Sequence, residues 1–261
     1  MNELVDFIEH SDMWSEPFVD ILDRSPGTSI DQAYDLQIAT MARKVAKGDR
    51  IIGYKAAGTT RSAQNLLGEQ PYPIIGTLLA SQILGEGGIY ELKQGTTYVE
   101  AEICIMLGKD LVGPTITYHD ALGAIDCFVP AMEISPWSPA AMDKKRSFQR
   151  IIATQKLNGK VVLGRSKVSA SKIDLRFEGA VVEVDGEIVG SGTGAEVMGD
   201  PIESLIAMAR RLFRHGVELK AGMIFMTGSV AMPHPGTTDM RSARVGFTRL
   251  GSVSARFRNP V

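Results

Sequence analysis

The stretch YVEAEICIM, residues 98–106, decides the fold and the chemistry expected of the rest of the chain. As a β-strand it places successive side chains on opposite faces, and one of these faces is entirely apolar. The other face starts with Glu100 and Glu102 and becomes apolar at Cys104 and Met106. This pattern is not that of a solvent-facing surface, so two carboxylates are expected side by side at the border of a buried region.

Two explanations fit this pair of carboxylates. Like charges held close together repel, and a buried carboxylate without a partner costs free energy. A divalent cation removes both penalties, and ligands that are all oxygen suit magnesium, manganese or calcium. The alternative is an edge strand whose two glutamates are solvated, and this strand alone favours neither explanation.

A third carboxylate favours the metal. Residues 128–134, FVPAMEI, predict another apolar strand in which Glu133 shares its face with small apolar side chains. Pro130 cannot donate to a sheet ladder, which indicates an edge or a bulge there. Three glutamates in two apolar strands predict a metal site at Glu100, Glu102 and Glu133. The alternative for Glu133 by itself is a buried carboxylate that pairs with a lysine or arginine, which is the less economical explanation.

Lys55 stands out in a short predicted strand, residues 50–58. Its neighbours on the same face are Gly53 and Ala57, so the ammonium group is expected to be desolvated. Desolvation lowers the pKa of a lysine and suits it to proton transfer or to binding an oxyanion. The alternative is a lysine that reaches past the glycine to solvent.

Composition bounds the class of protein. The chain has 261 residues, a formal net charge of -2 and 44% hydrophobic residues, which allows one large domain and gives no sign of nucleic-acid or membrane partners. Its two cysteines, Cys104 and Cys127, are too few for a zinc motif and are expected as buried, reduced thiols of a cytoplasmic protein. The acidic N-terminus does not resemble a signal peptide, and no apolar run is long enough for a transmembrane helix.

Helical patterns occupy residues 1–24, 29–48 and 201–215, whereas strand patterns dominate the centre and the C-terminal half. A capping box at Ser29 and Gln32 begins the second helix, and Asp185-Gly186 predicts a type I′ hairpin turn. We therefore expect a single α+β catalytic domain, residues 1–261, with a mixed, rolled or barrel-like sheet. Residues 1–48 form its helical N-terminal layer and residues 49–261 its β-rich metal-binding core.

Proline and glycine punctuate the remaining segments. They predict a rigid loop at residues 71–76 and irregular structure at residues 135–139, and they place His234 in a loop. Residues 227–229, Thr-Gly-Ser, follow a strand, where a hydroxyl and backbone N–H groups are expected to meet an anion. The basic residues at 144–146 and Arg150 are expected on a solvated face, with a substrate carboxylate as the less favoured partner.

The motifs, taken in order, resemble the 2-keto-4-pentenoate hydratase and 4-oxalocrotonate decarboxylase group of the fumarylacetoacetate hydrolase superfamily. The similarity runs over nearly the whole chain. It rests on DQAY (31–34), GYK (53–55), TT (59–60), EAEI (100–103), VPAME (129–133), VLG (162–164), GTGA (192–195), LKAG (219–222) and TGS (227–229). The resemblance implies a β-roll fold like that of the family's C-terminal domain and Mg²⁺ or Mn²⁺ on the three glutamates. It also implies Lys55 in the pocket and 2-oxo acids from aromatic-compound breakdown as substrates.

The chain departs from this group after the third glutamate. Ser135, Pro136 and Trp137 stand where the group has an acidic residue, a small residue and an arginine. Residues 154–157, TQKL, replace a usual Asp-Asn-Ala-Ser, so the expected arginine and the polar support for water are missing. Trp137 and Lys156 predict a bulkier acid with an apolar middle or a distal carboxylate. Substrate contacts are expected at Thr59, Thr60, Trp137, Lys156, Thr227 and Ser229.

These observations give an order of functions. The first is a metal-dependent hydratase-type lyase acting on a 2-oxo or 2-hydroxydienoic acid, in which Lys55 transfers protons. Decarboxylation of a 2-oxo-enedioic acid is second, and hydrolysis of an acylpyruvate is third. A different class, a non-catalytic binder of small acids, is favoured by the replaced residues after Glu133. The protein is expected to form a homo-oligomer.

Overall fold

The structure is a computed structural model that describes residues 1–10, 21–67, 73–92, 95–137, 147–155 and 158–259. Within these residues no helix is both long and apolar enough to cross a membrane. The α-helices are α1 (Asn2–His10), α2 (Ile21–Arg24), α3 (Ile30–Ala46), α4 (Arg61–Leu67), α5 (Tyr118–Ala124), α6 (Phe148–Thr154) and α7 (Pro201–Arg214).

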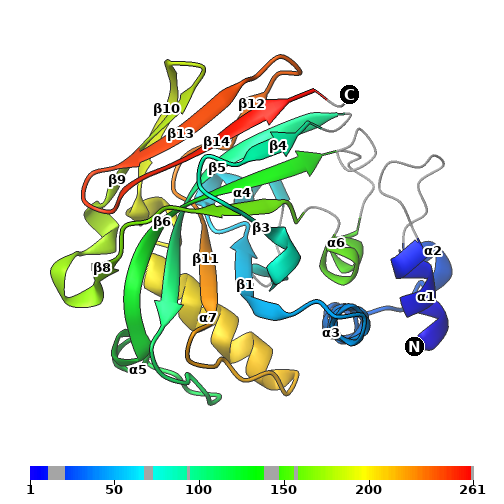
Figure 1. The fold of residues 1–261 in the computed structure, drawn as a ribbon. Coiled ribbons are helices and arrows are strands. Elements are labelled where there is room, and N and C mark those ends of the chain that lie inside the picture. Colours follow the sequence, from blue (N-terminus) through cyan, green and yellow to red (C-terminus); the bar gives the residue numbers. More distant parts are fainter. Residues whose placement is uncertain (11–20, 68–72, 93–94, 138–146, 156–157, 260–261) are drawn as a thin grey trace.

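Two sheets form the core (Figure 1). The larger sheet has the order β2-β1-β11-β5-β6-β7-β3, with β12 on β5 and β8 on β6. Its strands are β1 (Ile51–Ala57), β2 (Ile74–Leu79), β3 (Ile83–Leu84), β5 (Thr96–Leu107), β6 (Ile125–Trp137), β7 (Lys160–Leu163), β8 (Val168–Ser169), β11 (Ile224–Ser229) and β12 (His234–Gly236). The smaller sheet has the order β10-β9-β13-β14-β4. Its strands are β4 (Ile89–Glu91), β9 (Gly179–Val184), β10 (Glu187–Thr193), β13 (Ser242–Phe247) and β14 (Gly251–Arg258).

The larger sheet curls into a half-barrel, and helices cover it from outside (Figure 1). It is mixed, because β1 pairs with β11 and β3 pairs with β7 in parallel, whereas its other pairs are antiparallel. Helix α7 packs on β11 and β1, and α3 packs on α6 beside β2. The predicted α+β class, the rolled mixed sheet and the helical N-terminal layer are confirmed.

Strands β5 and β6 are the long central pair of the half-barrel, with 12 and 13 residues. Their antiparallel register sets Glu100 directly opposite Glu133, and Glu102 opposite Ala131. The predicted alternation along β5 is therefore confirmed. Residues 101–105 are buried on both faces of this strand, and β6 and β11 pair with it on either side, which rules out the alternative of an exposed edge strand.

An apolar floor lies inside the half-barrel next to the carboxylates. Cys104 follows Glu102 on the same face of β5 and pairs with Met226 of β11. Both side chains are fully buried. The floor consists of Leu78, Cys104, Cys127, Val129, Ala131, Val161, Ile224 and Met226. This low-dielectric surrounding determines the electrostatics of the site above it.

Proline positions in β6 follow from the neighbouring strands. β7 pairs with β6 only from Ala131 onward and β8 only up to Phe128, so Pro130 falls in the gap between them. The prediction of irregular structure at residues 135–139 is wrong for residues 135–137, which continue β6. Among the described residues, pairing with β7 ends at Ile134, so no described strand on that side needs the N–H that Pro136 lacks.

Two other loop predictions are corrected in the same way. Residues 74–76 belong to β2 instead of a loop, because β2 pairs with β1 along this stretch. His234 lies in β12, where it pairs with Val99.

The prediction that Arg150 lies on a solvated face is also wrong, because Arg150 is buried in α6. Residues 71–72, 138–139 and 144–146 lie outside the described residues.

Gln37 joins the N-terminal layer to the half-barrel. Its side chain is completely buried, and its amide nitrogen donates to Ile75 O of β2 at 2.9 Å and to Ile152 O of α6 at 2.8 Å. The amide oxygen accepts from the Thr77 hydroxyl at 3.2 Å. One side chain thus holds α3, α6 and β2 in a fixed relation.

We predict that Gln37→Leu destabilises the protein, because two buried carbonyls lose their donor, at a cost of about 1–3 kcal/mol each. Urea unfolding followed by circular dichroism measures the change. Ala42→Leu adds the same side chain on the exposed face of α3 and serves as control. Equal stability of Gln37→Leu and the wild type would contradict the anchoring role.

Candidate metal centre

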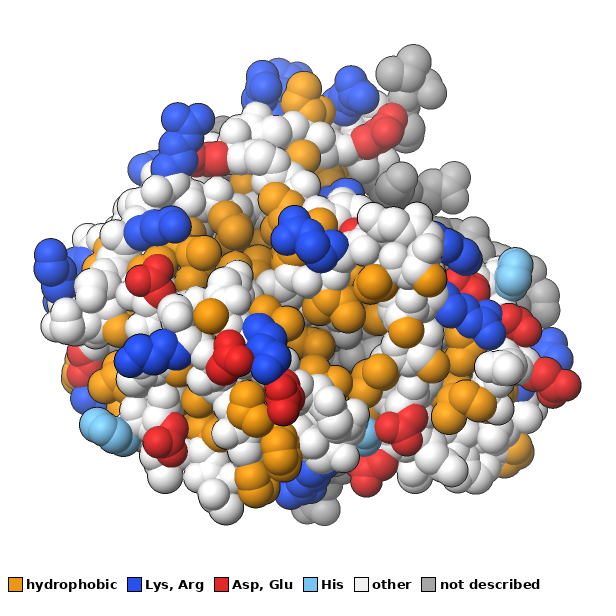
Figure 2. Space-filling model, turned by 60° about the horizontal axis from the view of Figure 1, so that its bottom comes forward, with side chains coloured by type: hydrophobic (Ala, Val, Ile, Leu, Met, Phe, Trp, Pro, Cys, Tyr) orange, Lys and Arg blue, Asp and Glu red, His pale blue; other side chains and the backbone are white. Residues whose placement is uncertain are grey.

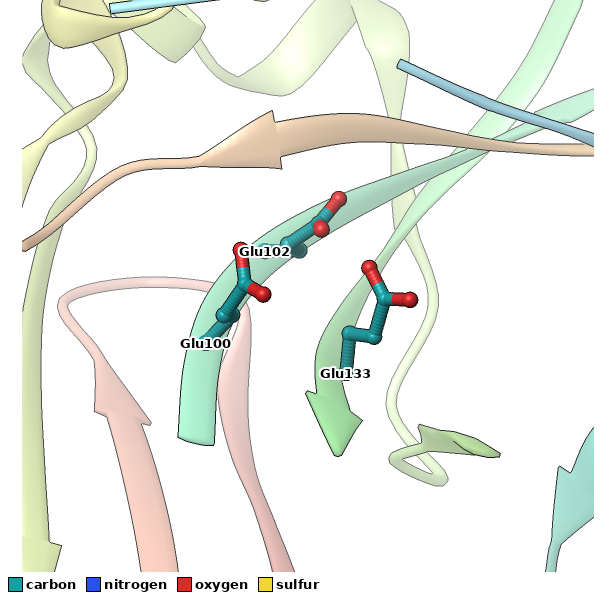
Figure 3. A group of neighbouring side chains, drawn as sticks. All are labelled: Glu100, Glu102 and Glu133. Atoms are coloured by element: carbon teal, nitrogen blue, oxygen red, sulfur yellow. The ribbon is translucent and has the colours of Figure 1, made fainter. Parts of the chain in front are cut away.

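Three carboxylates converge inside the half-barrel, as Figure 3 shows for Glu100 and Glu102 from β5 and Glu133 from β6. One oxygen from each lies within 4.8 Å of the others. Glu102 and Glu133 are 1% exposed, whereas Glu100 is half-buried. Glu100 therefore marks the side from which a ligand can approach.

Each carboxylate is held by a donor from a different element. Gly228 N–H donates to Glu102 Oε2 at 2.8 Å, and Gly159 N–H donates to Glu133 Oε1 at 3.2 Å. The Ser135 side chain, next along β6 on the Glu133 face, hydrogen-bonds to Glu100. These donors fix the three side chains.

Lys55 completes the cluster. Its Nζ lies 2.5 and 2.6 Å from the two oxygens of Glu133, and its side chain is 8% exposed. The alternative of a lysine that reaches solvent is excluded by this burial. The other alternative, a Glu133 paired with a basic residue, is observed together with the three-carboxylate cluster.

The protein charges in this cluster do not balance. Three carboxylates and one ammonium group give a formal charge of -2. Burial first, and then the charge of Glu133, raise the pKa of Glu100 to about 7. Burial and the charges of Glu133 and Glu100 raise the pKa of Glu102 well above its ordinary value. The cluster thus holds excess negative charge away from water.

The prediction that the pKa of Lys55 is lowered is wrong when only the protein's own residues surround it. Burial does lower the pKa of Lys55, but the charges of Glu133, Glu100 and Glu102 together outweigh burial and raise it. The ammonium group is therefore the stable form, and Lys55 carries a proton at Nζ. Sequence could not show this because Glu133 is 78 residues away along the chain.

A hard divalent cation fits this arrangement. The donors are oxygen atoms only, their separation suits binding to one ion, and a charge of +2 balances the formal -2. The raised pKa values of Glu100 and Glu102 reflect burial first and repulsion between carboxylates second, and a bound cation offsets both. The residues present fit magnesium or manganese without further change.

The Thr-Gly-Ser stretch forms a β-bulge. Between Met226 and Ser229 the register of β11 against β5 shifts by one residue. Gly228 lies there with φ +103°, which allows its N–H to face Glu102. Thr227 donates its hydroxyl to Ile103 O at 3.0 Å, and the Ser229 hydroxyl lies 2.8 Å from Ala231 O. The anion that meets this N–H is thus the Glu102 carboxylate of the protein itself.

The other residues predicted to contact substrate lie in different surroundings, and not all of their side chains are described. Thr59 is buried against Gly228, where a Cβ would lie 2.0 Å from Thr59 Oγ1. Thr60 accepts from Ala63 N–H at 3.2 Å and caps α4. Trp137 pairs with Thr96 at the end of β6, and its side chain is not described. Lys156 lies outside the described residues.

Two amide side chains that the sequence did not single out contact Thr77 of β2, next to Gly76, which pairs with Lys55. Gln155, which ends α6, accepts from Thr77 N–H at 2.7 Å, and Asn158 donates to Thr77 O at 3.1 Å. The expectation that residues 154–157 lack the family's polar support for water stays a prediction, although Gln155 and the following Asn158 bring two amides to β2. The signal was one amide inside the altered segment, Gln155, and a second directly after it, Asn158, followed by Gly159.

Comparison with known proteins defines the family. Residues 54–258 match the family model described as Fumarylacetoacetate (FAA) hydrolase C-terminal, so the chain belongs to the fumarylacetoacetate hydrolase family. It is 30% identical over 219 residues to 2-hydroxypent-2,4-dienoate hydratase of Pseudomonas putida. This match covers 83% of this chain and 97% of that relative. It is 28% identical over 258 residues to 4-oxalocrotonate decarboxylase of Pseudomonas putida, covering 97% and 95%.

A solved structure agrees with the sequence relatives. The chain is similar to 4-oxalocrotonate decarboxylase from Pseudomonas putida G7, complexed with magnesium and adipate, with a TM-score of 0.88. The sequence identity is 29%, and the match covers 98% of this chain and 96% of that one. The resemblance found in the motifs is confirmed by these matches.

We predict that Glu102→Gln abolishes Mg²⁺ binding measured by titration calorimetry, because a neutral amide removes a charge and an anionic oxygen. Glu203→Gln, on the exposed side of α7, makes the same change outside the cluster and should bind as the wild type does. An unchanged affinity in Glu102→Gln would remove this cluster as the metal site.

Metal affinity should also depend on pH. A carboxyl must lose its proton to bind a cation, and the pKa of Glu100 is about 7. We therefore expect Mg²⁺ affinity to fall as pH decreases from about 8 to about 6, with protons released on binding. Calorimetry in two buffers of different ionisation enthalpy measures that release. No proton release near neutral pH would contradict the raised pKa.

Proposed function

We propose that this protein is a metal-dependent hydratase-type lyase that acts on a 2-oxo or 2-hydroxydienoic acid from aromatic-compound breakdown. The observation that carries the proposal is the cluster of three carboxylates, with excess negative charge, next to the protonated Lys55. The hydratase relative supports it, because this chain spans 97% of that protein.

Glu100, Glu102 and Glu133 are proposed to hold one Mg²⁺ or Mn²⁺. Magnesium in the solved decarboxylase relative supports this choice. A cation held there would supply positive charge for binding a 2-oxo acid and for stabilising negative charge that develops at its keto oxygen. The half-buried side chain of Glu100 leaves the side of approach open, while the apolar floor closes the other.

Lys55 is proposed as the proton-transfer residue. Its Nζ is protonated, buried and fixed by two contacts with Glu133, so it presents a proton at one place. A positioned acid of this kind serves the conversion of the dienol to the keto form, which moves a proton from oxygen to carbon. Substrate contacts are proposed for Thr59, Thr60, Trp137, Lys156, Thr227 and Ser229.

Decarboxylation of a 2-oxo-enedioic acid is the second candidate. It is favoured by the similarity to 4-oxalocrotonate decarboxylase over 98% of this chain. Both reactions need the same stabilised negative charge at the keto oxygen and differ in whether water adds or carbon dioxide leaves. Parallel assays with 2-hydroxypenta-2,4-dienoate and 2-oxohex-3-enedioate decide between them. No turnover of either acid with Mg²⁺ or Mn²⁺ would refute the lyase proposal.

The wider setting is proposed from charge and organisation. The chain acts as one catalytic domain that assembles into a homo-oligomer in the cytoplasm, with a small acid as ligand. Acidic and basic side chains are interspersed on the face shown in Figure 2, and the formal net charge is -2. Neither feature favours a polyanionic partner such as nucleic acid.

We predict that Lys55→Met lowers kcat for the preferred acid by about 10²–10⁴, the range for a lost acid–base group. Mg²⁺ binding should persist, because the three carboxylates remain. Lys172→Met, at an exposed position, provides the matched control. A Lys55→Met enzyme with normal kcat would assign this lysine a structural role only.

A further inference from the structure

Asn158 lies beside Lys55 inside the half-barrel. In the pairing of β1 with β2, Lys55 is directly opposite Gly76, so both face the same side of the sheet. A Cβ at Gly76 would lie 2.8 Å from Asn158 Oδ1, 2.9 Å from Asn158 Nδ2 and 3.1 Å from Lys55 Cγ. The missing side chain at Gly76 therefore makes the space that the Asn158 amide occupies next to the lysine.

The orientation of this amide is fixed by its nitrogen. Asn158 Nδ2 donates to Thr77 O at 3.1 Å and to Gln155 Oε1 at 2.8 Å. Gln155 Oε1 also accepts from Thr77 N–H, which excludes the reversed orientation of the Gln155 amide. Both nitrogen hydrogens of Asn158 are thus used, and Oδ1 remains as an acceptor without a partner among the described residues.

The following residue ties this amide to the metal cluster. Gly159 N–H donates to Glu133 Oε1, the carboxylate that also contacts Lys55 Nζ. A side chain at Gly159 would clash with Ile134 O, 1.7 Å from its Cβ position. The backbone therefore holds Asn158 in one place relative to Glu133 and Lys55.

From this arrangement we infer that Asn158 orients the water that adds to the substrate, and so favours hydration over decarboxylation. Its Oδ1 accepts one hydrogen of the water beside Lys55, which leaves a lone pair on the water oxygen free to face the distal carbon. Asn158 orients this water and takes no proton from it. This inference rests on the proposed function.

The chemistry balances with one water molecule. The dienol 2-hydroxypenta-2,4-dienoate loses its hydroxyl proton and gains one at C5, which gives 2-oxopent-3-enoate. The water oxygen then bonds to C4, and the π electrons of the C3–C4 double bond form a new C–H bond at C3. The proton lost by the water is balanced by the proton gained at C3. The product is 4-hydroxy-2-oxopentanoate, and no oxidant or reductant is consumed.

The test compares Asn158→Ala with Asn158→Asp in the full-length protein with Mg²⁺. The aspartate variant keeps an acceptor at the same atom but loses the donor to Thr77 O, whereas the alanine variant loses both. Three quantities are measured for each: the hydration rate of 2-hydroxypenta-2,4-dienoate, deuterium uptake at C5 in D₂O, and Mg²⁺ affinity. Deuterium uptake reports the first proton transfer and needs no added water.

Asn158→Ala should lower hydration on the order of 10²-fold, the scale expected for a misplaced reactant, while deuterium uptake stays within about twofold of the wild type. Asn158→Asp should retain clearly more hydration than Asn158→Ala. Gln82→Leu is the control. It removes a neighbouring amide, which donates to Gly159 O, and should keep the wild-type ratio of hydration to deuterium uptake.

Other results overturn the inference. Equal loss of hydration in the alanine and aspartate variants would show that the donor to Thr77 O matters and the acceptor does not. A parallel fall of hydration and deuterium uptake, or a loss of Mg²⁺ affinity, would indicate a structural role. Absence of deuterium uptake in the wild-type protein would instead refute the proposed function itself, so the two failures are distinguishable.

Discussion

Repulsion among three carboxylates, two of them buried and one half-buried, is the constraint on which the rest of the structure depends. Their approach to within 4.8 Å above an apolar floor is unfavourable unless other groups supply positive charge or hydrogen-bond donors. The fold supplies one donor to each carboxylate and a lysine to Glu133. A formal charge of -2 remains uncompensated, which is the charge that one divalent cation would balance, so the fit to such an ion depends on several strands of the half-barrel.

The donors explain several local features that would otherwise be irregularities. The bulge in β11 exists where Gly228 must aim its N–H at Glu102. Gly159 has no room for a side chain because its N–H has to reach Glu133 past the backbone of β6. The contact between Lys55 and Glu133 acts on both residues. It holds the Glu133 carboxylate in place, and the charge of Glu133 keeps the proton on Lys55 Nζ.

The sequence predicts the parts of this site that obey the period of a strand. Glu100 and Glu102 share a face because alternation along β5 requires it, and Glu133 lies in an apolar strand that had to bury it. Features that depend on neighbours in space could not be predicted. Pro136 is tolerated in β6 only because β7 ends at Ile134, and the protonation of Lys55 depends on carboxylates from distant strands. Asn158 carries no motif, and its position is defined by the missing side chain of Gly76.

The amides of Gln155 and Asn158 also cover an edge of the larger sheet. Within the described pairing β2 has a strand partner on one side only, β1, and an unpaired edge of a sheet is a template on which another chain can add a strand. At Thr77 both backbone groups of this edge are already bound, the N–H by Gln155 and the carbonyl by Asn158. Side chains here imitate a neighbouring strand without offering a new edge. The same short segment thus gives the protein protection against edge-to-edge aggregation.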